Sequence, residues 1–136
     1  MKRASFLALV LSIGLFGCAG SAYELLPTSR EPAAQGHLKT KETSNGNVHI
    51  DLEVQHLAPA PKLSDGATTY VVWVRPAGGD GKPINVGALK VDKDLEGELE
   101  TVTSFTRFTL FVTAEADAQV TVPSGVDVLS SPPVKE

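Results

Sequence analysis

Acidic residues at alternate positions in the second half of the chain form its densest set of potential metal ligands. Asp92, Asp94 and Glu96 are followed by Gly97 at the sixth position, which is the spacing at the start of a calcium-binding loop. The twelfth position, however, is Thr103 rather than a bidentate glutamate, and the flanking segments favour strands over helices. We therefore interpret residues 92–97 as a hairpin turn whose carboxylates face water.

The same spacing continues into the next segment and places further acidic side chains on one side of it. Glu98 and Glu100 would project from one face of a strand, because alternate residues of a strand share a face. Such a face is usually solvated and protects a sheet edge from aggregation. A weak site for a cation or a basic partner is the alternative interpretation.

Three histidines are the other potential metal ligands, and their positions do not favour a shared site. His49 and His56 are an odd number of positions apart, so on one regular strand they would face opposite sides, and His37 lies in another segment. We therefore expect neither a metal ion nor another cofactor. Serine catalysis has no recognisable motif, because the chain lacks a Gly-x-Ser-x-Gly sequence. We expect a protein that is not an enzyme, and the sequence identifies no ligand-binding residues.

The first residues of the chain have the pattern of an export signal. Lys2 and Arg3 precede an apolar run, residues 4–16, which is too short for an ordinary transmembrane helix and is soon followed by Cys18. A basic start and a short apolar run are typical of secretory signal peptides. The chain is therefore expected to leave the cytoplasm.

The residues around Cys18 resemble the bacterial lipobox, where a signal peptide is cleaved after diacylglycerol is attached to the cysteine. Leu15, Gly17 and Cys18 match that pattern, whereas Phe16 is bulkier than the residue usual at its position. The resemblance implies cleavage between Gly17 and Cys18 and a lipidated, palmitate-carrying N-terminus. A conventional cleavage within residues 19–22 is the alternative. Because Cys18 is the only cysteine, no internal disulfide can form and the core must hold the fold.

These features divide the chain into four predicted parts. They are a lipoprotein signal peptide (residues 1–17), the lipidated cysteine with a flexible linker (18–34), a β-sandwich domain (35–130) and a polar tail (131–136). The linker assignment rests on small residues, prolines and charges that follow no regular period. Its apolar residues could instead dock on the domain as a short strand or turn; they are Tyr23, Leu25 and Leu26.

From Gln35 onward the apolar residues recur with period two, which predicts strands. In residues 48–55, for example, apolar and polar side chains alternate, as on a strand with one buried and one wet face. Segments bounded by Gly- and Pro-rich turns predict strands over residues 48–55, 69–75, 84–91, 98–102, 108–114 and 126–129. Six or seven short strands without an amphipathic helix favour an all-β, antiparallel, immunoglobulin-like sandwich.

Two aromatic residues of one predicted strand could form either part of the core or a platform for a ligand. Tyr70 and Trp73 are three positions apart, so they would point to opposite faces of that strand. We expect Trp73 to fill the interior, as a tryptophan on a central strand of a small sandwich usually does. We expect Tyr70 to lie at the rim, with its hydroxyl hydrogen-bonded.

Several short motifs follow one another along the predicted domain. They are Tyr-x-x-Trp in residues 70–76, Gly79, Gly-Lys-Pro at 81–83 with the strand to 89, the turn at 92–97, Thr-x-Glu ending 108–115, and Pro-x-Gly at 123–125. This order resembles the extracytoplasmic domain of anti-sigma-K-type regulators over residues 35–130, which implies a related fold and a role in the cell envelope. Those regulators also carry a helical sigma-binding domain and a transmembrane helix. We expect neither here, so the resemblance does not imply sigma-factor sequestration.

The charge balance limits the classes of partner. The formal net charge is −4, which argues against nucleic acid and against electrostatic attachment to anionic lipid. Membrane association is therefore expected through acyl chains on Cys18. Ala19 stands where aspartate retains enterobacterial lipoproteins at the inner membrane, which favours the periplasmic face of the outer membrane.

The sequence as a whole predicts a lipid-anchored protein of the cell envelope that acts as a non-catalytic binding or structural module. Another envelope protein is its expected partner. An accessory role in an extracytoplasmic, anti-sigma-like stress pathway is the alternative function.

Overall fold

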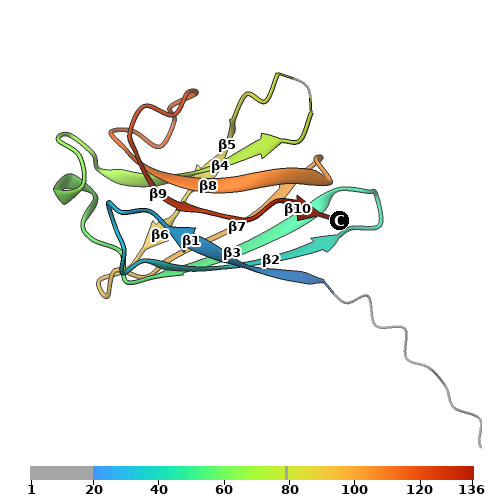
Figure 1. Cartoon of the computed structure of the whole chain (residues 1–136), viewed down its shortest axis with the longest axis horizontal. Coiled ribbons are helices and arrows are strands. Elements are labelled where there is room, and N and C mark those ends of the chain that lie inside the picture. The colour runs from blue at the N-terminus through green and yellow to red at the C-terminus, as the bar shows by residue number, and fades with distance from the viewer. Residues whose placement is uncertain (1–19, 79) are drawn as a thin grey trace, which may run out of the picture.

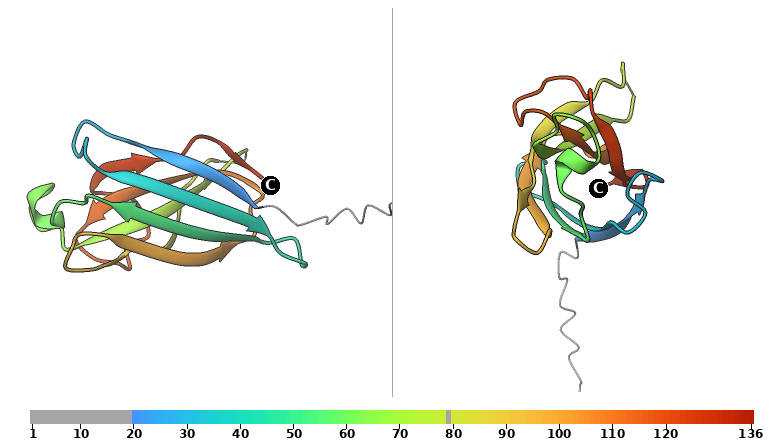
Figure 2. Two further views of the ribbon diagram at one scale, coloured as in Figure 1. Left: turned by 90° about the horizontal axis from the view of Figure 1, so that it is seen from below. Right: turned by 90° about the vertical axis from the view of Figure 1, so that its left-hand side faces the viewer.

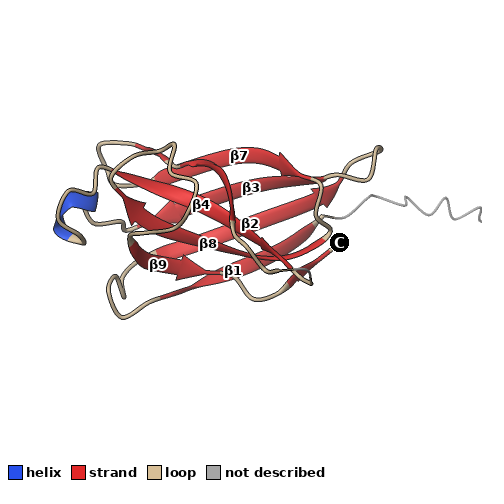
Figure 3. Cartoon of the chain, turned by 90° about the horizontal axis from the view of Figure 1, so that it is seen from above, coloured by secondary structure: helices blue, strands red, loops and turns tan. Residues whose placement is uncertain are grey.

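The computed structural model describes residues 20–78 and 80–136 and shows an all-β protein (Figures 1 and 3). Its strands are β1 (Ser21–Pro27), β2 (Gln35–Glu42), β3 (Val48–Gln55), β4 (Thr69–Pro76), β5 (Ile84–Ala88), β6 (Lys90–Val91), β7 (Gly97–Thr103), β8 (Arg107–Glu115), β9 (Val126–Ser130) and β10 (Val134–Lys135). A short 3-10 helix, η1 (Ala60–Lys62), lies between β3 and β4. No helix in the described part of the chain has the length and apolar character needed to cross a bilayer.

The strands form one antiparallel sheet that curls into a nearly closed barrel. Its order is β5-β4-β8-β9-β1-β2-β3-β7-β6, and β10 pairs with β8 beside this path. The end-on view shows the strands surrounding a central space (Figure 2). β4, β8 and β9 lie on one side and β1, β2 and β3 on the other (Figure 1). The all-β, antiparallel class expected from the period-two pattern is therefore confirmed.

The predicted flexible linker is wrong over residues 21–27, which form β1 within the sheet. Residues 21–25 pair with β2, and the last two residues of β1 pair with β9, so this strand joins the two sides of the barrel. Leu25 is buried, whereas most of its neighbours are exposed or half-buried. The local pattern is therefore weak, and strand partners that are distant in sequence decide the conformation. The alternative in which this segment docks as a strand is the one that the structure contains.

The predicted polar tail also contributes to the fold. Val134 is buried and pairs with Phe108 of β8, so the tail ends in the short strand β10. The backbone N–H of Glu136 donates to the carbonyl of Thr106, at 2.9 Å. The described residues form ten strands rather than six or seven, because β1 and β10 come from the expected linker and tail and β2 lies outside the six expected strand ranges. The expected strand over residues 84–91 is also divided into β5 and β6.

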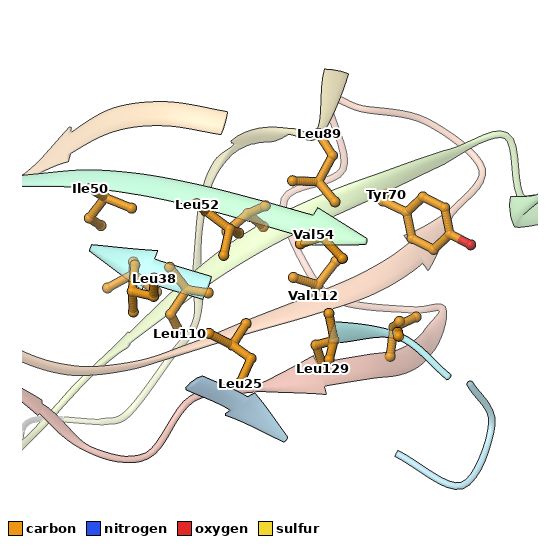
Figure 4. Packing of buried hydrophobic residues seen from close by; sticks show 14 of the residues in the cluster. Leu25, Leu38, Ile50, Leu52, Val54, Tyr70, Leu89, Leu110, Val112 and Leu129 are labelled. Atoms are coloured by element: carbon orange, nitrogen blue, oxygen red, sulfur yellow. The ribbon is translucent and has the colours of Figure 1, made fainter. Parts of the chain in front are cut away.

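The core consists of inward-facing side chains from both sides of the barrel. Figure 4 shows leucines and valines of opposing strands pointing into the same space, as the period-two pattern predicts. All four apolar residues of β3 are buried; they are Val48, Ile50, Leu52 and Val54. This burial is the main source of stability, because the chain has no disulfide.

β4 is buried on both faces, and its two aromatic residues do point in opposite directions. Trp73 is fully buried, but it belongs to a small outer cluster with Val71 and Phe111, against which Val120 of the β8–β9 loop packs. Tyr70 faces the main core and is 2% exposed, so the prediction that it lies at the rim is wrong. Its hydroxyl does find a partner, the carbonyl of Ala58.

The position of β1 predicts the effect of shortening the chain. A chain that begins at Gly20 should fold, whereas one that begins at Ala34 lacks the strand between β9 and β2 and exposes two strand edges. We expect the shorter chain to lose most of its cooperative urea unfolding transition, followed by circular dichroism, and to aggregate. Equal unfolding midpoints for the two chains would show that β1 is dispensable.

Candidate functional site

The predicted lipidation site lies just before the first strand. Gly17 and Cys18 are outside the described residues, and β1 begins at Ser21. The chain can span at most about 11 Å from Cys18 to Ser21, because an extended residue covers about 3.6 Å. The start of β1 is at the same end of the barrel as the C-terminus and the β2–β3 turn (Figures 1 and 2). A lipid on Cys18 would therefore hold this end of the barrel near the membrane.

The acidic run at residues 92–97 is a hairpin turn between β6 and β7, as predicted. The Oδ1 atom of Asp92 accepts the backbone N–H groups of Asp94, at 2.9 Å, and Glu96, at 3.0 Å. Leu95 completes the turn with a φ of 60°. Asp94 and Glu96 are exposed to solvent. The carboxylate of Asp92 thus stabilises the turn, and the described residues contain no group of three or more metal-ligating side chains.

The outer face of β3 and β7 is acidic and exposed, as the alternate spacing predicts. Glu98 lies opposite Glu53, and Glu100 lies opposite Asp51, so like charges face one another across the strand pair. Such cross-strand pairs are mildly destabilising. One carboxylate has a diagonal partner, because the Nε2 atom of His49 lies 2.8 Å from the Oε1 atom of Glu100. This face is solvated and gathers no closed ligand set.

The other two histidines lie apart from this pair. The Nδ1 atom of His37 is 2.7 Å from the Oε1 atom of Glu24, across the β1–β2 pair. His56 follows β3 with a φ of 58° and is exposed. The fold therefore does not bring the three imidazoles together, and each of the two paired histidines has a carboxylate of its own.

The barrel is left open at a seam between β5 and β7. β5 is hydrogen-bonded only to β4, and among the residues of β7 only Gly97 and Glu98 pair with β6. Over residues 99–103, this edge of β7 therefore has no hydrogen-bonded partner strand in the described part of the chain. The two strands approach closely at one point, where a Cβ on Gly87 would lie 3.0 Å from a methyl carbon of Leu99.

A groove of about 890 Å³ follows this seam. It is lined by residues 84–88 of β5, by residues 101–105, and by residues 118–121 of the β8–β9 loop, and none of these residues is charged. Val86 and Phe105 line it and also pack against the main core. Ile84 and Val102 are large apolar residues exposed there, by 43% and 50%. The groove thus combines a free strand edge with an uncharged, partly apolar lining, and it is our candidate binding site.

Asn85 fixes one wall of this groove. Its side-chain amide donates hydrogen bonds to the carbonyls of Ala118, at 2.9 Å, and Val120, at 2.8 Å. Its Oδ1 atom accepts the backbone N–H of Gly87 at 2.9 Å. All three contacts are internal, so the β8–β9 loop is held against β5 before any ligand binds.

A buried polar network holds the same loop from behind. The Nε1–H of Trp73 donates to the Oγ1 of Thr113 at 2.8 Å, and that hydroxyl donates to the Oε1 of Glu115 at 2.6 Å. Ser124 donates to the same carboxylate from its backbone N–H, at 3.0 Å, and from its hydroxyl, at 2.8 Å. A Cβ on Gly125 would lie 1.7 Å from the carbonyl oxygen of Ala114, so only glycine fits there. This hydrogen-bonded network therefore combines residues of three of the sequence motifs, which are Tyr-x-x-Trp, Thr-x-Glu and Pro-x-Gly.

Two buried carboxyl groups have opposite electrostatic environments. Burial raises the pKa of Glu31 and outweighs the hydrogen bond from the backbone N–H of Ala58, which favours its charged form. Its Oε2 atom is buried without a hydrogen-bond partner. Burial and the negative charge of Glu31 also raise the pKa of Tyr70. For Glu115, burial is outweighed by the hydrogen bonds from Thr113 and from residues 124–125, so its pKa is held below the usual value.

These environments predict opposite effects of two matched substitutions on the free energy of unfolding. Glu115 stabilises the fold above the carboxyl pKa of the unfolded chain, near 4.5, and this contribution is lost as the pH falls through its lower folded pKa. Glu31 has a raised folded pKa, so its contribution is present below the unfolded value and is lost as the pH rises.

We expect Glu115→Gln to lower the free energy of unfolding by about 1 to 3 kcal/mol at neutral pH, with a smaller deficit in acid. We expect Glu31→Gln to raise it at neutral pH, with a gain that shrinks toward acid. Urea unfolding at several pH values measures both, and the exposed Glu98→Gln serves as the control. Parallel pH profiles for all three variants would contradict these assignments.

Sequence reasoning did not identify the seam, although one signal pointed to it. Val102 shares the alternate spacing of Glu98 and Glu100 and is an apolar residue on an otherwise acidic, exposed face. An exposed valine on an edge strand is consistent with a contact surface. That β5 lies opposite this strand cannot be read from the spacing, because the two strands are not hydrogen-bonded to one another.

The groove and the buried network are described from the structure of this chain, without a related protein for comparison. Comparison of the sequence with protein-family models and with curated proteins gave no match.

Proposed function

We propose that the protein is a lipid-anchored, non-catalytic binding module of the bacterial cell envelope. The observation that carries this proposal is the sequence from Lys2 to Cys18, a basic start and an apolar run that end in a lipobox-like cysteine. The cysteine would carry the acyl chains, and the barrel would act as the exported domain.

The short distance from Cys18 to the barrel supports an anchor rather than a long tether. Because β1 starts at Ser21, the domain would stand close to the bilayer in a restricted orientation. The β2–β3 turn and the C-terminus would then face the lipid surface. The β1–β2 loop, η1 and the β6–β7 turn lie at the other end of the barrel (Figures 1 and 2) and would face away from it.

The periplasmic face of the outer membrane is the proposed location. Ala19, rather than aspartate, follows the cysteine, which favours transfer away from the inner membrane. The acidic face of β3 and β7 supports attachment through acyl chains and not through charge, since anionic headgroups would repel it.

Binding is favoured over catalysis by the character of the groove. Its lining holds no titratable side chain that could transfer a proton, and its walls are strand edges with apolar and uncharged polar residues. His37 and His49 lie on the exposed faces of strands. A surface of this kind is suited to contact with another protein of the envelope.

We further propose that the barrel is a variant of an immunoglobulin-like sandwich. Support comes from the way its strands divide into two layers, with β4, β5, β8 and β9 opposite β2, β3 and β7, and with β1 shared between them. Interior side chains of both layers interdigitate in one core.

An accessory role in an envelope stress pathway is the second candidate function. The observation that favours it is the convergence of three motifs of the anti-sigma-K-type resemblance on the network around Thr113 and Glu115. Deletion of the gene should then change the output of an extracytoplasmic stress reporter. An unaltered reporter under envelope stress would leave the binding module as the sole candidate.

The anchor is tested by labelling cells with a palmitate analogue and separating their membranes, with Cys18→Ala as the matched variant. The proposal requires that the wild-type chain carries the label and sediments with membranes after a high-salt wash, which removes proteins held only by charge. An unlabelled, soluble wild-type chain would contradict it.

A further inference from the structure

We infer that the groove between β5 and β7 is a strand-addition site for an extended, uncharged segment of a partner protein. The inference deepens the proposed binding function and rests on it only for the location of the partner. The segment would lie along residues 101–105, at the end of β7 where the groove opens, and close the seam of the barrel.

The first argument is the free backbone edge of β7. This strand pairs with β3 along its whole length, from Gly97 to Thr103, but with β6 only at Gly97 and Glu98. An unpaired strand edge carries N–H and C=O groups that an added strand can satisfy. The groove opens beside residues 101–105, so a bound segment of about five residues matches its length, at about 3.3 Å per residue.

The second argument is the chemistry of the lining. About a fifth of the whole chain is charged, yet none of the residues lining the groove is charged. A charged side chain placed there would lose hydration without gaining an ionic partner. Val86 and Phe105 reach the main core and remain partly exposed, so alternate apolar side chains of a bound strand would extend that core outward. The occupant is therefore an uncharged segment with apolar residues at alternate positions.

The third argument is that the site is built before the ligand arrives. Asn85 holds residues 118–120 against β5, and the network around Glu115 fixes the other end of the same loop. Little conformational entropy would then be lost from this wall on binding.

A second copy of the same chain fits the edge less well than a foreign segment. Pairing two β7 edges would bring the rows that contain Glu98 and Glu100 next to one another, and such like charges oppose edge-to-edge association. A short neutral segment avoids this repulsion.

The test uses the protein as purified from its host in detergent micelles and a library of capped, uncharged octapeptides of Ala, Gly, Ser, Thr, Val and Ile. Hydrogen exchange followed by mass spectrometry should show at least tenfold slower amide exchange within residues 101–105 when the library is added. A matched library with alternate N-methylated residues, which cannot complete a strand ladder, should give no protection. A library with Lys or Glu at every second position should also give none.

Side-chain variants separate this groove from other apolar surfaces. Peptides selected from the library should bind Val102→Lys and Ile84→Lys at least tenfold more weakly than the wild type. Leu26→Lys changes an even more exposed apolar residue of β1, outside the groove, and should bind as the wild type does. All three residues are exposed, and circular dichroism verifies that each variant is folded.

Four results would overturn the inference. They are the absence of binding by every uncharged peptide, equal binding of the N-methylated library, stronger binding of the charged library, and protection of β7 that rises with protein concentration alone, which identifies a second copy as the occupant. Palmitate labelling is independent of all four, so failure of strand addition is distinguishable from failure of the proposed anchor.

Discussion

We expect Cys18→Ala to abolish acyl labelling completely and to leave the uncleaved precursor in the cell. The thiol of Cys18 is both the proposed lipid acceptor and the landmark for cleavage, and the chain has no second cysteine to replace it. The variant should therefore migrate more slowly than the mature wild-type protein and incorporate no palmitate analogue. Gel mobility and in-gel detection of the label measure both effects.

Two controls make this result specific. Phe16→Ala introduces a residue usual at that lipobox position, so this variant should be labelled at least as well as the wild type. The barrel begins after Cys18, so the Cys18→Ala chain should give the same β-type circular dichroism. Normal labelling and membrane fractionation of Cys18→Ala would refute the lipoprotein assignment.

We expect Trp73→Ala to lower the free energy of unfolding by about 3 to 5 kcal/mol. Trp73 is fully buried, its ring stacks on Phe111 with centroids 6.3 Å apart, and it donates the first hydrogen bond of the network to Thr113. Truncation creates a cavity and removes the donor to a buried hydroxyl. Since small domains are stable by only about 5 to 15 kcal/mol, this loss is a large share of the total. Chemical denaturation followed by circular dichroism measures it.

Two matched variants divide the effect into its parts. Trp73→Phe keeps an aromatic ring and removes the N–H donor, so its cost should be smaller, at about 1 to 3 kcal/mol. Val122→Ala changes an exposed residue of the β8–β9 loop and should stay within about 0.5 kcal/mol of the wild type. Iodide should quench the native indole poorly. If Trp73→Ala left the free energy of unfolding nearly unchanged and iodide freely quenched the wild-type fluorescence, this indole would lie at the surface.

The sequence by itself determined the features that depend on local pattern. The alternation in residues 48–55 predicted which side chains of β3 are buried, and the spacing of Tyr70 and Trp73 predicted their opposite directions. Residues 92–97 begin like a calcium loop but lack its final glutamate and its flanking helices, and this departure correctly predicted a hairpin turn. These predictions succeed because the alternation of side chains along a strand and the hydrogen bonds of a turn involve residues close in sequence.

Only the tertiary structure decided which segments meet. Residues 21–27 look irregular alone and become β1 because β2 and β9 supply hydrogen bonds on its two edges. The outward face of β4 is buried because the β8–β9 loop packs against it. Trp73 is therefore buried outside the main core, whereas Tyr70 lies inside that core. The groove exists because the curled sheet brings β5 close to the part of β7 that β6 does not cover, and these two strands approach without pairing. Strand partners and barrel closure depend on contacts between distant residues, and the period of a single strand does not encode them.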